Sequence, residues 1–230
     1  MSYNIAIIAA GGHGSRIGST LPKQYHVLRD KPILMHTISA FQGIADKIIL
    51  VISEQMIPLW QSQCKEYDFD IAHEIVTGGN TRFESVQNGL QYIQHRHNDL
   101  TTENTAIAVH DAARPLVDPN LIRQSFLLCH QGQGNVLAIK STNSVRIGSQ
   151  LSSRAVDRND VWLIQTPQTF PANILMEAFA EKEKPHFTDE ASVVEHLGYN
   201  ISILESTPRN LKITYPEDLI IAQMYLNNPI

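Results

Sequence analysis

The sequence has few cysteines, no long apolar run and no excess of positive charge. Only Cys64 and Cys129 occur among 230 residues, which is too few for a disulfide framework. No apolar stretch approaches the roughly twenty residues that cross a bilayer, and the chain opens without the basic and apolar regions of a secretory signal. Its formal net charge of −5 leaves no broad basic surface for a nucleic-acid backbone. These absences predict a cytoplasmic protein with free thiols that binds neither nucleic acid nor a membrane.

The apolar content is typical of one folded unit. With 43% hydrophobic residues in 230 positions, the chain can bury one sizeable core and is short for two. We therefore predict a single domain over residues 1–230. Buried-strand patterns alternate with helical periodicity, which predicts an α/β, Rossmann-like fold with a mostly parallel twisted sheet flanked by helices. The expected strands are 5–10, 47–52, 74–77, 105–111, 135–140, 161–170 and 201–205.

The first strand leads into a glycine-rich loop. The run from Ile5 to Ala10 has the composition of a strand buried on both faces. Its glycines allow the backbone to approach a ligand closely, and two cations follow, Arg16 and, directly after Pro22, Lys23. Two positive side chains beside a glycine loop suit a polyphosphate.

Two common phosphate loops do not match this stretch. The Walker pattern needs a glycine followed by lysine at a spacing that Gly11, Gly12 and Gly14 do not provide. The dinucleotide fingerprint needs a third glycine where Ile17 stands, and the next buried strand ends about twice too far along the chain. The loop therefore belongs to neither class.

A second glycine turn follows the strand at 74–77. Gly78 and Gly79 precede a helix for which Thr81 and Glu84 predict a capping box. Glycines beside a helix N-terminus favour an anion or a polar base edge. An ordinary strand-to-helix turn remains the alternative. The predicted buried stripe of this helix consists of Phe83, Val86, Leu90 and Ile93.

The strand at 105–111 ends in a carboxylate. Asp111 falls at the carboxyl end of an apolar run, where open parallel sheets bind their ligands. Magnesium on a polyphosphate is held by one or two carboxylates together with phosphate oxygens and water. Asp111 is therefore a candidate metal ligand; the alternative, a helix cap, is weakened because Asp118 and Pro119 can begin the next helix themselves.

Residues 140–158 differ from the rest of the chain. Alternating residues on either side of Gly148-Ser149 predict a hairpin with little apolar material to bury by itself. Such a hairpin needs a partner.

Six sequence blocks share the pattern of a known family. They are A-A-G-G-x-G-x-R with P-K-Q, G-G-x-x-R-x-x-S-V, H-D-A-A-R-P, Q-T-P-Q-x-F, F-T-D-E-A-S and the block from Asn210 to Leu219. Together they resemble the nucleotidyltransferases with a glycosyltransferase-A-like sheet, and the P-K-Q form resembles the cytidylyltransferases that act on 2-C-methyl-D-erythritol 4-phosphate. The resemblance covers almost the whole chain.

The resemblance implies transfer of CMP from CTP to that acceptor, a Mg²⁺ ion, and a homodimer clasped through the arm at 140–158. It implies catalytic roles for Arg16, Lys23 and Lys212, and makes Asp111 the metal ligand. The implied nucleotide-binding residues are Ala9, Ala10, Gly11, Gly12, Gly14, Gly79, Asn80, Ser85 and Ala112. The implied acceptor-binding residues are Arg114, Ser144, Arg158, Thr166 and Thr188, with Arg158 reaching the neighbouring subunit's acceptor phosphate.

Some positions keep two interpretations. Thr188 fits both an acceptor contact and a helix N-cap, and Thr214 with Glu217 predicts a second capping box. Relatives often carry aspartate at the position of Asn80 and an acid at that of Arg209. Two alternative functions remain: a cytidylyltransferase for ribitol 5-phosphate, and a catalytically silent nucleotide-binding protein.

Overall fold

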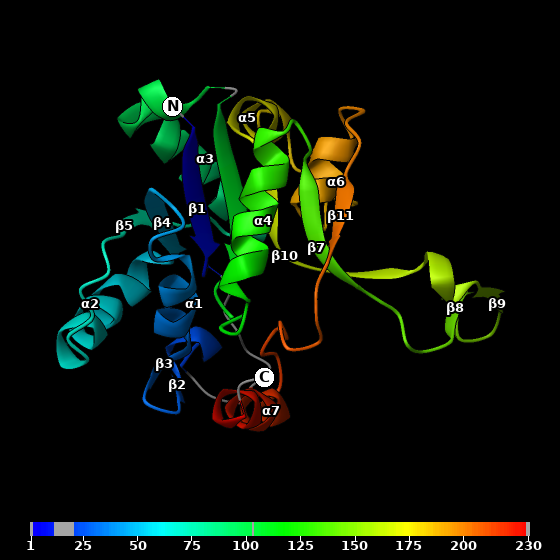
Figure 1. Cartoon of the computed structure of the whole chain (residues 1–230), viewed down its shortest axis with the longest axis horizontal. Helices are drawn as coiled ribbons and strands as arrows, with labels where there is room; N and C mark the ends of the chain where they lie inside the picture. Colours follow the sequence, from blue (N-terminus) through cyan, green and yellow to red (C-terminus); the bar gives the residue numbers. More distant parts are fainter. Residues whose placement is uncertain (1, 12–20, 103, 229–230) are drawn as a thin grey trace.

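The computed structural model describes residues 2–11, 21–102 and 104–228, and a seven-stranded sheet forms its centre (Figure 1). The strand order is β11-β7-β10-β6-β1-β4-β5, and β10 alone in this sheet runs antiparallel to its neighbours. The predicted mostly parallel sheet is therefore confirmed. The bounds are β1 Tyr3–Ala9, β4 Lys47–Ile52, β5 Glu74–Thr77, β6 Thr105–Asp111, β7 Asn135–Lys140, β10 Trp162–Pro171 and β11 Ser202–Glu205.

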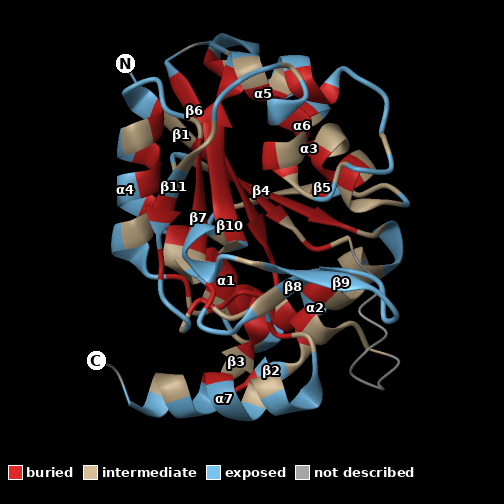
Figure 2. Cartoon of the chain, turned by 90° about the vertical axis from the view of Figure 1, so that its right-hand side faces the viewer, coloured by how far each residue is buried: buried red, intermediate tan, exposed pale blue. Residues whose placement is uncertain are grey.

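Helices cover both faces of this sheet (Figure 2). Side chains of α1 (Ile33–Phe41), α2 (Ile57–Glu66) and α4 (Pro119–His130) share one buried cluster with Ala6 and Ile8 of β1. Side chains of α3 (Arg82–Arg96), α5 (Ala172–Phe179) and α6 (Glu190–Glu195) share the opposite cluster with Ile5 and Ile7. Because successive residues of a strand point to opposite faces, β1 is buried on both sides, as its composition predicts.

A smaller layer lies beyond the carboxyl ends of the strands. The helix α7 (Pro216–Asn227) packs there beside the two-stranded ribbon of β2 (Val27–Leu28) and β3 (Lys31–Pro32). The sequence pattern did not predict this ribbon, since each of its strands has two residues. Every helix among the described residues is too short or too polar to cross a bilayer.

Three predicted helix starts need correction. At the start of α3, one of the two predicted capping-box bonds forms: the Thr81 side chain accepts from the Glu84 N–H at 3.0 Å. In the other, the Glu84 carboxylate accepts from the N–H of Asn80 instead of that of Thr81. Thr188 is not an N-cap, because Asp189 holds that position and exchanges hydrogen bonds with Ser192. The predicted capping box of Thr214 and Glu217 at the start of α7 is also wrong. In its place Asp218 accepts the N–H groups of residues 214 and 215.

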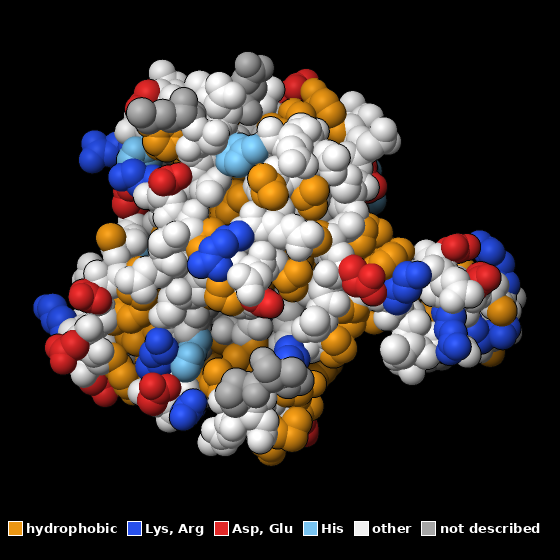
Figure 3. All heavy atoms as spheres, viewed as in Figure 1, with side chains coloured by type: hydrophobic (Ala, Val, Ile, Leu, Met, Phe, Trp, Pro, Cys, Tyr) orange, Lys and Arg blue, Asp and Glu red, His pale blue; other side chains and the backbone are white. Residues whose placement is uncertain are grey.

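The hairpin forms an arm that projects from the body (Figure 1). Its strands are β8 (Val145–Gly148) and β9 (Ser153–Val156), joined by a turn in which the Ser149 N–H donates to the Ser152 carbonyl at 2.7 Å. Gly148 has a positive φ of 142°, which a residue with a Cβ adopts only with strain. Leu151 at the tip is 99% exposed. In Figure 3 the arm carries basic and acidic side chains, and the visible face of the body shows no continuous basic patch.

Candidate active site

The two glycine turns meet at the carboxyl ends of the strands. A Cβ on Gly11 would lie 2.6 Å from the Ser85 Oγ, so the first turn lies directly against that hydroxyl. The Gly79 N–H donates to the same Oγ at 3.1 Å, and the Ala112 N–H donates to the Ala9 carbonyl at 3.1 Å. The turns after β1 and β5 and the residue after β6 therefore form one surface, although they lie far apart in the sequence.

Asp111 is the centre of a charged cluster on this surface. Its side chain is mostly buried, and Oδ2 lies 3.0 Å from the Lys212 Nζ and 3.2 Å from the Arg114 Nε. Oδ1 lies 3.4 Å from Nε of Arg82. Burial alone would raise the pKa of Asp111, but these three cations outweigh it and hold that pKa far below its usual range. The carboxylate is therefore ionised at neutral pH.

A buried hydrogen-bond chain positions Asp111 from behind. The Asp111 N–H donates to the Thr166 Oγ1 at 3.0 Å, and that hydroxyl lies 3.1 Å from the His110 Nδ1. The His110 Nε2 lies 3.1 Å from the Arg114 carbonyl, which can only accept, so Nε2 carries the proton. Burial lowers the pKa of His110 to about 4. Neutral His110 therefore accepts from Thr166, and every member of the chain has a partner.

Asn210 joins this chain to the segment that carries Lys212. Its carbonyl accepts from the Arg114 Nη1 at 2.8 Å, and its amide donates to the Thr166 carbonyl at 2.9 Å. Three residues further on, the Ile213 N–H donates to the Ala113 carbonyl at 2.8 Å. These bonds on both sides fix the backbone of Lys212 beside Asp111, so the third and sixth sequence blocks meet in space.

Arg82 lies between two carboxylates. It is the first residue of α3, and besides Asp111 it pairs with Glu190, the first residue of α6, through two hydrogen bonds, one of them 2.9 Å between Nη2 and Oε2. Glu190 is 0% exposed. Gln168 of β10 fixes this end of α6 because its amide bonds both the Asp189 carboxylate and the Ala191 N–H. The sequence indicated only a first-turn acid at Glu190, and nothing local to it signals a partner 108 residues away.

The remaining predicted residues belong to the loop after β1 and to the start of α6, and some of them lie outside the described residues. Lys23 begins a short 3-10 helix (Lys23–Tyr25) next to the site, since its neighbour Gln24 donates to the Ala10 carbonyl at 2.8 Å. Gly12, Gly14 and Arg16 lie outside the described residues. Thr188 is exposed and precedes the start of α6, where its N–H donates to Ser192. Its acceptor-binding role stays a prediction.

The predicted arm residues lie outside the cluster around Asp111. Ser144 and Arg158 are exposed, and the Arg158 Nη1 donates to the Thr142 carbonyl at 3.1 Å across the base of the hairpin. Within the described part of the chain, no hydrogen bond or ion pair joins either residue to Asp111. Their roles toward an acceptor stay predictions. Thr166, also predicted as an acceptor contact, is buried with its hydroxyl engaged behind Asp111.

Arg209 and Asn80, the two positions at which relatives often carry an acid, have different surroundings. Arg209 donates to the carbonyls of Tyr225 and Asn228 and lies 4.8 Å over the Tyr225 ring, so this cation stabilises the carboxyl end of α7. Asn80 is exposed, and its N–H donates to the Glu84 carboxylate at 2.6 Å. Arg209 is therefore explained by the fold, whereas Asn80 lies at the open edge of the site.

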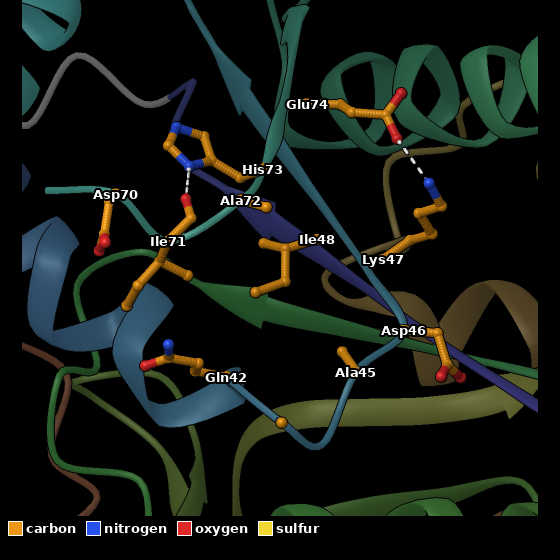
Figure 4. A pocket seen from close by; sticks show the side chains of 11 residues that line it. Gln42, Ala45, Asp46, Lys47, Ile48, Asp70, Ile71, Ala72, His73 and Glu74 are labelled. Carbon is orange, nitrogen blue, oxygen red and sulfur yellow. Dashed lines mark hydrogen bonds and ion pairs between the residues drawn. The ribbon is translucent and has the colours of Figure 1, made fainter.

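A separate hollow lies at the opposite edge of the sheet, where β4 and β5 begin. It has a volume of about 520 Å³. Figure 4 shows Asp46 and Asp70 on opposite sides of it, with Lys47 paired to Glu74 at 3.7 Å. The His73 ring bonds the Ile71 carbonyl and accepts from the Trp60 indole at 2.9 Å. The charged side chains of this hollow are therefore dispersed or paired locally.

Comparison with known proteins places this geometry in a family. The sequence model of the 2-C-methyl-D-erythritol 4-phosphate cytidylyltransferases matches residues 4–228. The chain belongs to this family. A cytidylyltransferase of that name from Bacteroides fragilis is 40% identical over 223 residues, which cover 96% of this chain and 98% of that protein. One from Azobacteroides pseudotrichonymphae is 40% identical over 230 residues, covering 99% and 100%.

Solved structures of cytidylyltransferases share the fold. The crystal structure of the Francisella tularensis 2-C-methyl-D-erythritol 4-phosphate cytidylyltransferase is 31% identical, covers 97% of this chain and 99% of its own, and superposes with a TM-score of 0.77. The predicted family, fold class and enzyme class, a nucleotidyltransferase, are therefore confirmed.

The donors at the site fit a cation that arrives with a nucleotide. Among residues 2–11, 21–102 and 104–228, no group of three or more His, Cys, Asp or Glu side chains could hold a metal. Mg²⁺ does not need such a group, since it is commonly held by one carboxylate, phosphate oxygens and water. Of the contacts made by described residues, Oδ1 of Asp111 has only the 3.4 Å contacts of Arg82 and is the less engaged oxygen. Asp111 therefore suits a shared magnesium ion in a cytidylyltransferase.

Proposed function

We propose that this chain transfers CMP from CTP to 2-C-methyl-D-erythritol 4-phosphate, releasing pyrophosphate, in the synthesis of isoprenoid precursors. The observation that carries the proposal is the cluster of Arg82, Arg114 and Lys212 around the ionised Asp111. It lies at the carboxyl ends of the strands, where such sheets bind ligands.

The reaction needs no general base. The attacking group is a phosphate monoester oxygen, which is already anionic near neutral pH. It forms a bond to the α-phosphorus of CTP while the bond from that phosphorus to the leaving pyrophosphate breaks. His110 is buried, neutral and bonded on both ring nitrogens, so it cannot accept a proton from the acceptor. Catalysis would then consist of positioning and charge stabilisation.

The cations would divide this task. Lys23, with Arg16, would stabilise the charge that grows on the α-phosphate and the leaving pyrophosphate. Lys212, held at Asp111, would reduce the repulsion between the two anionic substrates. A Mg²⁺ ion held by Asp111 would neutralise phosphate charge. Arg114, 8% exposed, would bind the acceptor from the same side.

The glycine turns would hold the nucleoside. Gly11 and Gly79 place side-chain-free backbone next to the Ser85 hydroxyl. A flat base and a ribose can approach such a surface closely. The side-chain carbonyl of Asn80 can accept from the cytosine amino group, as an aspartate would. Ala9, Ala10 and Ala112 complete this wall.

We also propose that the arm joins two copies of this chain. Large apolar side chains are exposed on it and on the adjacent part of β10: Ile147, Leu151, Leu163 and Ile164. A second copy would cover them, and Ser144 and Arg158 would then reach that copy's acceptor. The free cysteines Cys64 and Cys129 accord with a cytoplasmic location.

Pyrophosphate release tests the proposed reaction. We expect release with CTP, Mg²⁺ and 2-C-methyl-D-erythritol 4-phosphate, and less than a tenth of that rate with UTP or with ribitol 5-phosphate. A higher rate with ribitol 5-phosphate would assign the protein to polyol activation. Binding of CTP without release with either acceptor would favour a silent nucleotide-binding protein.

A further inference from the structure

Arg82 binds its two carboxylates unequally. Toward Glu190 it makes two hydrogen bonds from separate nitrogens to separate oxygens, the geometry of a bidentate pair. Toward Asp111 its Nε and Nη2 both lie 3.4 Å from the single oxygen Oδ1. The guanidinium of Arg82 is therefore held mainly by Glu190, and its contact with Asp111 is longer and weaker.

The two oxygens of Asp111 differ for the same reason. Oδ2 takes Lys212 at 3.0 Å and Arg114 at 3.2 Å, and both contacts are within the normal range for an ion pair. Among the described residues, Oδ1 has only the two long contacts of Arg82. It is the oxygen that can accept another ligand without losing a close partner.

Glu190 is fixed firmly enough to restrain Arg82. It is fully buried as the first residue of α6, between Asp189, which caps the helix, and Ala191, whose N–H is held by Gln168. A buried cation that loses its partner is destabilised and turns to the nearest remaining anion. Without the Glu190 charge, that anion would be Asp111.

We propose that Glu190 is a positioning residue that holds Arg82 back from Asp111 and so keeps Oδ1 available to a divalent cation. This inference rests on the proposed function, in which Asp111 holds the metal of the CTP complex. Glu190 itself contacts no substrate in this assignment; it acts through Arg82.

The test is the binding of Mn²⁺ to the full chain saturated with CTP, without acceptor. Water-proton relaxation distinguishes Mn²⁺ on the protein from Mn²⁺ on free CTP. Glu190→Gln keeps the size of the side chain and removes its charge. We expect the Mn²⁺ midpoint to rise about tenfold, because Arg82 then closes on Oδ1. The control Glu195→Gln, at the exposed end of the same helix, leaves the midpoint unchanged.

A double variant separates positioning from structural support. In Arg82→Met/Glu190→Gln the competing guanidinium is gone, so the Mn²⁺ midpoint should return to within threefold of wild type although turnover is lost. A purely structural role for Glu190 would leave the double variant at least as impaired in metal binding as Glu190→Gln. If Glu190→Gln does not fold, Glu190→Asp replaces it, with an expected rise of about threefold.

Asp111→Asn shows which claim has failed. If this variant loses the Mn²⁺ signal and Glu190→Gln binds within twofold of wild type, the role of Glu190 is wrong and the metal site stands. If Asp111→Asn binds Mn²⁺ like wild type, the proposed metal site itself is wrong, and the inference about Glu190 falls with it.

Discussion

The two edges of the central sheet differ in what they do with charge. At the carboxyl edge, Asp111 is buried among three cations that approach it from three separate segments of the chain. At the amino edge there is a hollow of about 520 Å³, but Asp46 and Asp70 lie on opposite sides of it and Lys47 is paired with Glu74 near solvent (Figure 4). Volume alone does not make a reactive site; buried charges that converge on one point do.

The topology explains this difference. In parallel strands the carboxyl ends meet at one edge, and the helices that follow them begin there. Both α3 and α6 place their first residues, Arg82 and Glu190, at that edge. Helix N-termini favour anions, so this edge suits both carboxylate side chains and the phosphates of a ligand. At the amino edge, no helix of the described residues starts beside the first residues of β4 and β5.

Asp111→Asn should have the largest effect. The variant loses the charge that balances Arg82, Arg114 and Lys212 and that would hold the proposed metal, so we expect kcat to fall at least about a thousandfold. The matched control Asp70→Asn, at the amino edge, should stay within twofold. Initial rates of pyrophosphate release measure both, and equal losses in the two variants would erase the distinction between the edges.

Lys23→Ala should cause the second-largest loss of kcat. If Lys23 donates to the phosphates as proposed, its removal should lower kcat by at least about a hundredfold, with CTP binding reduced less. Lys65→Ala, an exposed position on α2, serves as the control. A Lys23→Ala enzyme with kcat within threefold of wild type would remove Lys23 from the chemistry.

The buried hydrogen bonds behind Asp111, which involve His110, predict that the stability of the protein depends on pH. His110 has its pKa lowered to about 4, so below about 6.5 the unfolded chain binds a proton that the folded chain does not. The free energy of unfolding should therefore fall as pH drops from about 6.5 toward 4. Between pH 7.5 and 5.0 the loss from His110 is about 2 kcal/mol. Urea unfolding of wild type and His110→Gln measures it, and equal pH slopes in the two proteins would contradict the neutral His110.

The smallest effect on turnover should come from the amino edge. In His73→Ala the indole N–H of the buried Trp60 loses its acceptor, which should lower the free energy of unfolding by about 1 to 2 kcal/mol. The same variant should keep kcat/KM within twofold. A tenfold loss of kcat/KM in a folded His73→Ala protein would show that the hollow takes part in the reaction.

Local patterns predicted the elements of the fold well. The strands at 47–52, 105–111 and 135–140 have the expected bounds, because each is an apolar run ended by polar residues. Asp118 and Pro119 begin α4 as the capping rule predicts. The wrong caps at Thr188 and Thr214 show the limit, since neighbouring acids compete for the same N–H groups and tertiary bonds decide between them.

From local sequence patterns, without the family resemblance, the site was predictable only where it follows strand ends. Asp111 stood out because it ends a buried strand, and the two glycine turns stood out for the same reason. The partners of Asp111 come from positions 82, 114 and 212, and no periodicity connects them. His110 and Glu190 were missed because their roles depend on hydrogen bonds across the sheet.

The most direct test is to locate bound CTP by backbone amide NMR of the wild-type protein with Mg²⁺. We predict that the amide shifts that change on titration are those of Gly79, Asp111 and Ala112 at the carboxyl edge. Those of Asp46, Ile71 and Glu74 around the hollow should stay in place. Changes confined to the hollow, with Asp111 and Ala112 unmoved, would contradict the assignment of the active site.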